Sequence, residues 1–171
     1  MPLFRITKKL ATALRIKQVA LSVESTRPEY EWFADLFYVE RKKCIIWVHR
    51  PTLFTFVRPA VVAAELREFH PLFRYEFRTA IASMALPESL IDHFGIYQPE
   101  AYAPTNERAV VGSMLDHRKI FKIMVDLEGG LERADIRALN TMLNEIPMSL
   151  LGMKSALTRV RTLPSVSPML H

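Results

Sequence analysis

The sequence predicts an α+β fold in which a small, mostly antiparallel sheet is packed by four or five helices. Residues 31–57 are rich in aromatic and β-branched side chains, as strands usually are. Several later segments repeat apolar side chains at helical spacing instead. The chain has 171 residues, half of them hydrophobic, which is enough for one domain with its own core. We assign that domain to residues 1–161 and expect residues 162–171 to form a flexible tail.

The N-terminal segment predicts a short strand followed by a helix. Residues 2–6 suit the strand, and Thr7 suits the N-cap of a helix that ends near Arg15. A threonine hydroxyl can accept one of the backbone N–H groups that the first helical turn leaves unpaired. Residues 22–30 then predict a loop, because Pro28 interrupts any regular element.

The central segment predicts a Trp- and Phe-rich β-hairpin. Its strands cover residues 31–39 and 43–49, a charged turn occupies residues 40–42, and a third strand covers residues 52–57. Strand alternation gives the first strand apolar side chains on both faces. We therefore expect either helices on both faces of the sheet or a partner chain on one of them.

The later part of the chain predicts the remaining helices. Apolar side chains recur there at steps of three and four residues, as one buried helix face requires. Proline and glycine mark the boundaries of these segments. The predicted helices cover residues 59–86 with a split or kink at Pro71, residues 87–94 ending at Gly95, a segment capped by Thr105 or Asn106 and ending at Gly129, and residues 133–145.

The net charge of +5 is concentrated near the N-terminus. Residues 1–50 hold ten lysines and arginines against five acidic residues, whereas residues 51–171 hold thirteen of each. This asymmetry favours a binding module that is not an enzyme and that contacts nucleic acid or an acidic protein surface. A solvated surface that only maintains solubility is the alternative. The cations assigned to this contact are Lys8, Lys9, Arg41, Lys42 and Lys43.

A second hypothesis is an enzyme with a polar pocket. Asp35 lies in an apolar strand, so its carboxylate needs a partner, and a structural ion pair would serve as well as a catalytic role. Asn106 and Arg108 lie near the predicted start of a helix, where an arginine could hold an anion. Asn140 and Asn144 are four residues apart and share one helix face. The pocket would need Asp35, Asn106, Arg108 and Asn140 to converge.

The remaining residue types exclude several classes of site. The single cysteine, Cys44, excludes a disulfide framework, and its predicted strand places it on the opposite face from His49. No histidine spacing suits a metal, so we expect no metal, no cofactor and no catalytic residue. No segment is apolar enough to cross a membrane, and we expect a cytoplasmic protein. A structural homodimer that buries the face of Trp32 and Trp47 is the third hypothesis.

The sequence also resembles a bacterial family of domains of unknown function, family six-nine-three-three. The resemblance implies small bacterial proteins, some carried by mobile elements, and no established reaction. It also implies that several residues named above belong to the family pattern, together with Trp32, Gly112, Ser113 and Pro147. The matching segments run in order to about Arg161 and are TKKL at 7–10, WFADLFYVERKKC at 32–44, TLFTFV at 52–57, TNERAVVGSM at 105–114, EGGLE at 128–132 and LNTMLNEIPMSLLG at 139–152.

Overall fold

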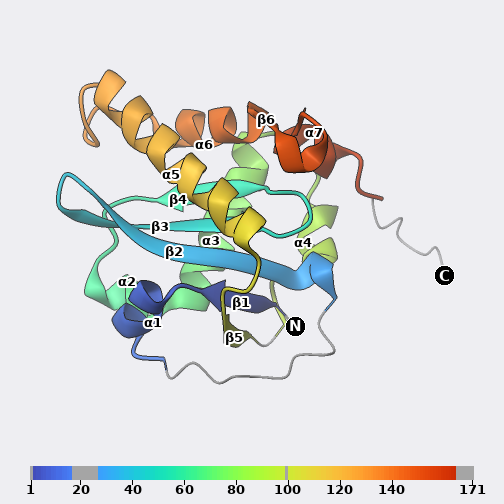
Figure 1. Cartoon of the computed structure of the whole chain (residues 1–171), viewed down its shortest axis with the longest axis horizontal. Helices are drawn as coiled ribbons and strands as arrows, with labels where there is room; N and C mark the ends of the chain where they lie inside the picture. The colour runs from blue at the N-terminus through green and yellow to red at the C-terminus, as the bar shows by residue number, and fades with distance from the viewer. Residues whose placement is uncertain (1, 17–26, 99, 165–171) are drawn as a thin grey trace.

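A computed structural model describes residues 2–16, 27–98 and 100–164 and confirms the α+β fold. A five-stranded sheet lies between helices on both of its faces (Figure 1). The strands are β1 (Leu3–Ile6), β2 (Glu31–Val39), β3 (Lys42–His49), β4 (Thr55–Arg58) and β5 (Ala101–Pro104). The helices are α1 (Lys8–Leu14), α2 (Ala63–Arg67), α3 (Phe69–Ser83), α4 (Ser89–His93), α5 (Arg108–Leu127), α6 (Ile136–Glu145) and α7 (Ala156–Arg161). Residues 165–171 of the predicted tail and residues 22–26 of the predicted loop lie outside the described residues.

The sheet has the order β4-β3-β2-β1-β5 and is mixed. The predicted hairpin supplies its antiparallel part, in which β3 pairs with β2 on one side and with β4 on the other. The N-terminal strand β1 then lies parallel to both β2 and β5. A two-residue turn closes the hairpin, and both of its residues, Glu40 and Arg41, have positive φ, at 51° and 64°. That conformation matches the twist of the strands that it joins.

One face of the sheet is covered by α3 and carries an aromatic core. Trp32 and Trp47 are fully buried there, and their rings lie 5.0 Å and 6.0 Å from the ring of Phe73. The chain's own helix therefore fills the face that we assigned to a homodimer. That prediction was wrong about the surface, because two buried indoles leave no apolar area there for a second copy.

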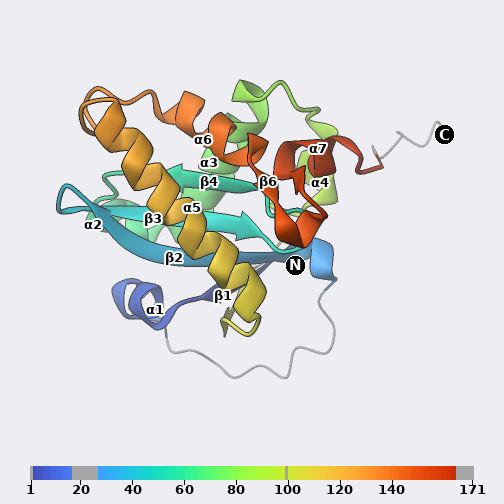
Figure 2. The same ribbon diagram turned by 45° about the horizontal axis from the view of Figure 1, so that its top comes forward.

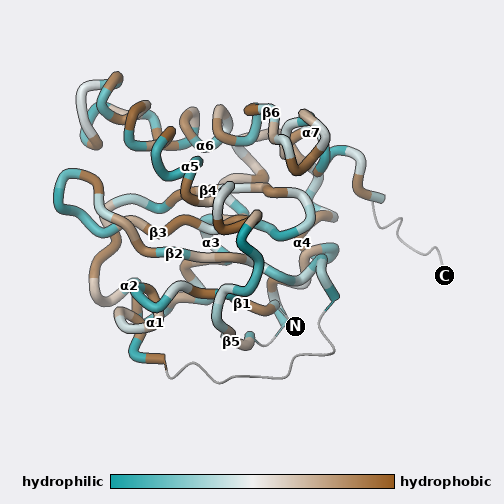
Figure 3. The backbone as a smooth tube through the Cα atoms, viewed as in Figure 1, coloured by the Kyte–Doolittle hydropathy of each residue, from teal (hydrophilic) through white to brown (hydrophobic). Residues whose placement is uncertain are grey.

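The opposite face is covered by α5 and α6, and Figure 2 shows α5 crossing the strands. Phe37 on β2 meets Phe121 on α5 at a centroid distance of 6.1 Å. The expectation of helices on both faces is thus confirmed. The hydropathy colouring in Figure 3 places hydrophobic residues along β2 and β3 and hydrophilic residues at the tip of the hairpin.

The caps and breaks of the helices are partly as predicted. Thr7 caps α1 by accepting the N–H of Leu10, and Pro71 lies in the first turn of α3, just after the break between α2 and α3. The predicted cap of the long helix was wrong. The helix α5 begins one to two residues later than a cap at Thr105 or Asn106 would require. Glu107 therefore occupies the cap position, and its side chain forms no capping hydrogen bond.

Four short elements complete the described fold. The chain enters β2 through a 3-10 turn, η1 (Pro28–Tyr30). After α6 it forms a small hairpin of β6 (Pro147–Met148) and β7 (Lys154–Ser155), which encloses a second 3-10 turn, η2 (Ser149–Leu151). This hairpin leads directly into α7, whose first turn is capped by the hydroxyl of Ser155.

Candidate functional site

The predicted cations Lys8, Lys9, Arg41, Lys42 and Lys43 lie on α1 and at the tip of the β2–β3 hairpin, which together with α2 occupy one end of the molecule (Figures 1 and 2). Lys8, Lys9, Arg41 and Lys42 are exposed, and Lys43 is half-buried. The ammonium group of Lys9 lies 4.7 Å from the centre of the Tyr38 ring, which ties α1 to β2. We name the whole set the basic end, and its members are Lys8, Lys9, Arg15, Arg41, Lys42, Lys43 and Arg67.

A cavity of about 540 Å³ lies within the basic end. Three cations from three different elements line it: Arg15 after α1, Lys43 at the start of β3, and Arg67 at the end of α2. Its other lining residues are small or apolar, namely Ala13, Leu14, Ala63 and Leu66. The sequence analysis did not single out Arg67, because it lies outside the basic N-terminal third and joins the cluster only through the packing of α2 against α1.

The cations of the basic end differ from other arginines in the same chain. Arg5 and Arg50 both bind the carboxylate of Glu31, at 3.0 Å each, and Arg50 also binds Glu107 at 2.8 Å. Within the described residues, no carboxylate lies within 4.0 Å of any charged group of the basic end. The seven cations of the basic end therefore form no ion pair with a described carboxylate, and an anion would meet their charge.

Asp35 is buried and fully engaged in structural contacts. One carboxylate oxygen accepts the hydroxyl of Thr7 at 2.5 Å and the N–H of Leu36 at 2.9 Å. The other oxygen binds Arg118 of α5 at 2.5 Å. Arg118 was not predicted, although position 118 lies four residues after Met114 and therefore interrupts the buried stripe of α5 with a charge. These contacts favour the structural ion pair over a catalytic carboxylate.

Asn140 and Asn144 bind the edge of the sheet. The amide of Asn140 accepts the N–H of Val57 and donates to its carbonyl, at 2.9 Å and 3.2 Å. Asn144 forms the same pair with Thr55, at 2.8 Å and 2.6 Å. The two side chains therefore replace a missing neighbouring strand and fix α6 along β4. The polar strip predicted from their spacing thus binds the backbone of β4, and we name these two asparagines the backbone clamp.

The four residues of the predicted enzyme pocket have separate surroundings. Asp35 and Val57 both pair with Ile46, so the strand bonded by Asn140 lies two strand spacings, about 10 Å, from Asp35. Asn106 and Arg108 are exposed at the start of α5. The contacts of Asp35 and Asn140 thus supply no shared polar pocket in the described part of the chain, and the observations favour structural roles for both.

The remaining polar side chains in the core are also accounted for by structure. Cys44 is buried, and burial raises the pKa of its thiol, which disfavours the thiolate form. It lies in the core under α5, whereas His49 packs against Trp32 on the other face, as the alternation predicted. The described residues hold no group of three histidine, cysteine or carboxylate side chains suited to a metal. No helix among them has both the length and the hydropathy of a membrane span.

The comparison with known proteins agrees with the resemblance noted in the sequence. No curated protein matches this chain. A family model described as "Domain of unknown function (DUF6933)" matches residues 3–157, which include every strand and all the helices except the last residues of α7. Because the match covers most of the sequence and of the described fold, the chain belongs to this family of domains of unknown function.

Proposed function

We propose that this protein is a binding module, not an enzyme, and that its basic end contacts a polyanion. Nucleic acid is the first candidate, and an acidic protein surface is the second. The observation that carries the proposal is the cavity in which Arg15, Lys43 and Arg67 converge without a carboxylate among the described lining residues. Like charges held together in this way repel one another, so a bound anion would stabilise the arrangement.

The architecture of the basic end suits a long, charged partner. The hairpin tip, with Arg41 and Lys42, lies at the same end of the molecule as α1 and α2 (Figure 1), and the cavity is lined by the end of α1, the start of β3 and α2. Cations from separate elements can contact successive phosphates or carboxylates along one strand of a polymer. The single cysteine accords with a cytoplasmic setting, which we include in the proposal.

A salt titration tests the proposal directly. Labelled single-stranded DNA, RNA and polyglutamate would be titrated with the protein, and affinity would be measured from about 50 mM to 200 mM salt. Contacts with phosphates predict that the logarithm of the affinity falls linearly with the logarithm of the salt concentration. Absence of binding to all three polymers at about 50 mM salt would sink the proposal, because such contacts should be strong there.

Charge-removing variants locate the contact. Lys43→Gln combined with Arg67→Gln should weaken binding and should reduce the salt slope by about two, roughly one for each lost contact. The matched control is Arg159→Gln with Arg161→Gln, two exposed cations of α7 outside the basic end. Equal losses in the two double variants would mean that binding follows total charge and not the basic end.

A further inference from the structure

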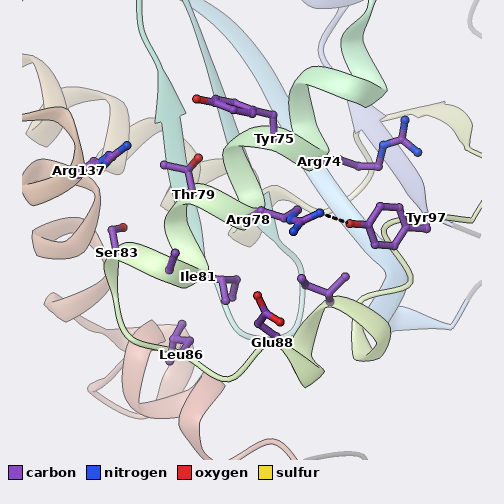
Figure 4. A pocket seen from close by; sticks show the side chains of 12 residues that line it. Arg74, Tyr75, Arg78, Thr79, Ile81, Ser83, Leu86, Glu88, Tyr97 and Arg137 are labelled. Carbon is purple, nitrogen blue, oxygen red and sulfur yellow. Dashed lines mark hydrogen bonds between the residues drawn. The ribbon is translucent and has the colours of Figure 1, made fainter.

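A second and larger cavity, of about 910 Å³, lies on the outer side of α3 (Figure 4). It is bounded by α3, by α4 and the segment before it, by Tyr97 in the loop before β5, and by Arg137 of α6. Neither the basic end nor the residues predicted from the sequence contribute to it. We name it the arginine–tyrosine groove, and its principal members are Arg74, Tyr75, Arg78, Glu88, Tyr97 and Arg137.

Two arginines of α3 hold Tyr97 in place at one side of the groove. Arg78 donates to the Tyr97 hydroxyl at 2.8 Å, which is the dashed contact in Figure 4. The guanidinium of Arg74 lies 5.7 Å from the centre of the same ring. A guanidinium has five N–H donors, so the bond to Tyr97 orients Arg78 and leaves most of its donors for a ligand. A planar fork of this kind suits the paired oxygens of a phosphate.

The groove has an excess of positive charge. Three arginines line it, and Glu88 is the one acidic residue among the described residues that do so. No carboxylate of the described chain lies within 4.0 Å of Arg74, Arg78 or Arg137. The adjacent Arg58 shows the contrast, because it binds Glu65 at 2.6 Å and Glu76 at 2.8 Å. The charge of Arg58 is thus neutralised within the chain, whereas the charges of the three groove arginines are not neutralised by a described carboxylate.

The rest of the lining is apolar and aromatic. Ile81, Leu86 and Ile91 contribute aliphatic surface. Tyr75 and Tyr97 remain 61% and 52% exposed, so their rings are accessible to a ligand in the groove. Exposed tyrosine rings can stack on a flat ligand ring, and a cavity of this volume is in the range of small-molecule sites. The lining thus offers cations for an anionic group and flat or apolar surface for a ring.

From this lining we propose that the arginine–tyrosine groove binds a mononucleotide-sized ligand, in which phosphate is joined to a planar base. Arg74 and Arg78 take the phosphate, and the base lies over the aliphatic floor beside a tyrosine ring. This site is separate from the polyanion contact of the basic end. Its ligand is a small molecule, because a cavity of about 910 Å³ is in the size range of small-molecule sites.

Calorimetric titration with ADP, pyrophosphate and adenosine tests both parts of this ligand. ADP should bind at least about tenfold more tightly than either fragment, because only ADP presents both an anion and a ring. Three results would overturn the proposal: no ADP binding at about 1 mM, pyrophosphate equal to ADP, or adenosine equal to ADP.

Variants assign the binding to the groove. Arg78→Ala and Arg74→Ala should each weaken ADP binding by about tenfold or more, since each removes a charge-assisted contact. Arg159→Ala, in α7, is the matched control and should have no effect. Lys43→Gln with Arg67→Gln separates this site from the basic end, and the groove predicts unchanged ADP affinity in that variant. If the Lys43→Gln, Arg67→Gln variant loses ADP binding and Arg78→Ala does not, the ADP site lies at the basic end and the proposal is refuted.

Discussion

The two faces of the sheet are both buried, yet they are held in different ways. The face under α3 is an aromatic cluster in which Trp32 makes ring contacts with Phe56, Phe73, Phe77 and Phe94 at 5.0–5.7 Å. Within the described residues, the indole N–H of Trp32 has no hydrogen-bond partner. That face therefore relies mainly on contact area and ring packing, which are strong but have little directional preference. The ion pair between Arg58 of β4 and Glu76 of α3, at 2.8 Å, adds a directional bond near the sheet edge.

The face under α5 and α6 combines apolar packing with directional bonds. Asp35 joins β2 to Arg118 of α5, and Asn140 and Asn144 join β4 to α6. His117 of α5 meets the hydroxyl of Thr55 at 2.9 Å. Each of these bonds permits one position of the helix along the strands. The comparison indicates that the aromatic face supplies most of the stability, whereas the polar bonds set the register of the helices on the other face.

Truncating the aromatic cluster should have the largest effect. Trp32→Ala removes a fully buried indole from the centre of five ring contacts and should lower the free energy of unfolding by about 3–5 kcal/mol. Urea denaturation followed by circular dichroism measures this. Tyr75→Ala, on the exposed side of α3, is the control and should cost under about 1 kcal/mol. Similar losses in the two variants would contradict the assignment of stability to this face.

Removing one asparagine of the backbone clamp should have the second largest effect. Asn144→Ala leaves the N–H and the carbonyl of Thr55 without their side-chain partner, and each buried group left unpaired costs about 1–3 kcal/mol. We expect a total of about 2–4 kcal/mol by the same urea measurement. Met142→Ala, on the exposed side of α6, supplies the control. A neutral Asn144→Ala would show that α6 is held by apolar contacts alone.

The Asp35–Arg118 ion pair should contribute less, because the Arg118 side chain keeps 23% of its exposure. Asp35→Asn retains the size of the side chain and removes the charge opposite Arg118, and we expect a loss of about 2 kcal/mol. A double-mutant cycle with Arg118→Met isolates the pair. If the pair is structural, the two losses will not be additive, and the coupling energy will be about 1 kcal/mol or more. Additive losses would show that the two side chains act independently.

The sequence predicted the buried apolar side chains of both faces far better than the polar contacts. Alternation alone assigned Trp32 and Phe33 to opposite faces, and both are fully buried there. Periodicity reports which side chains avoid water, and that information is local. It carries no information about which strand a polar group will meet, so the partner of Asp35, on a helix far along the chain, was not predictable.

The candidate sites show the same limit. Charge asymmetry indicated the basic end, because most of its cations are close in the sequence. Arg67 joins them only through the packing of α2 beside α1. The arginine–tyrosine groove gave no signal, since Arg74, Tyr97 and Arg137 come from three segments with no motif in common. The spacing of Asn140 and Asn144 was noticed, but the edge strand that they bind could not be read from it.

Acid titration sharpens the comparison, because each face holds a fully buried histidine whose pKa is lowered by burial. Burial lowers the pKa of His49, on the aromatic face, to about 3, and that of His117, on the other face, to about 4. Each histidine titrates near 6.5 in the unfolded chain, so below that pH the unfolded state binds more protons and the folded state loses stability. Between pH 6.5 and 5.5, each histidine should cost about 1 kcal/mol.

Single substitutions divide that pH dependence between the two faces. Urea denaturation at pH 6.5 and 5.5 should show that His49→Gln and His117→Gln each lose about 1 kcal/mol of the pH-dependent change, whatever their stability at pH 6.5. The two losses should be equal in this window, because both folded-state pKa values lie well below it. An unchanged pH dependence in His117→Gln would mean that His117 takes up its proton in the folded state, and that the polar face admits water where the aromatic face does not.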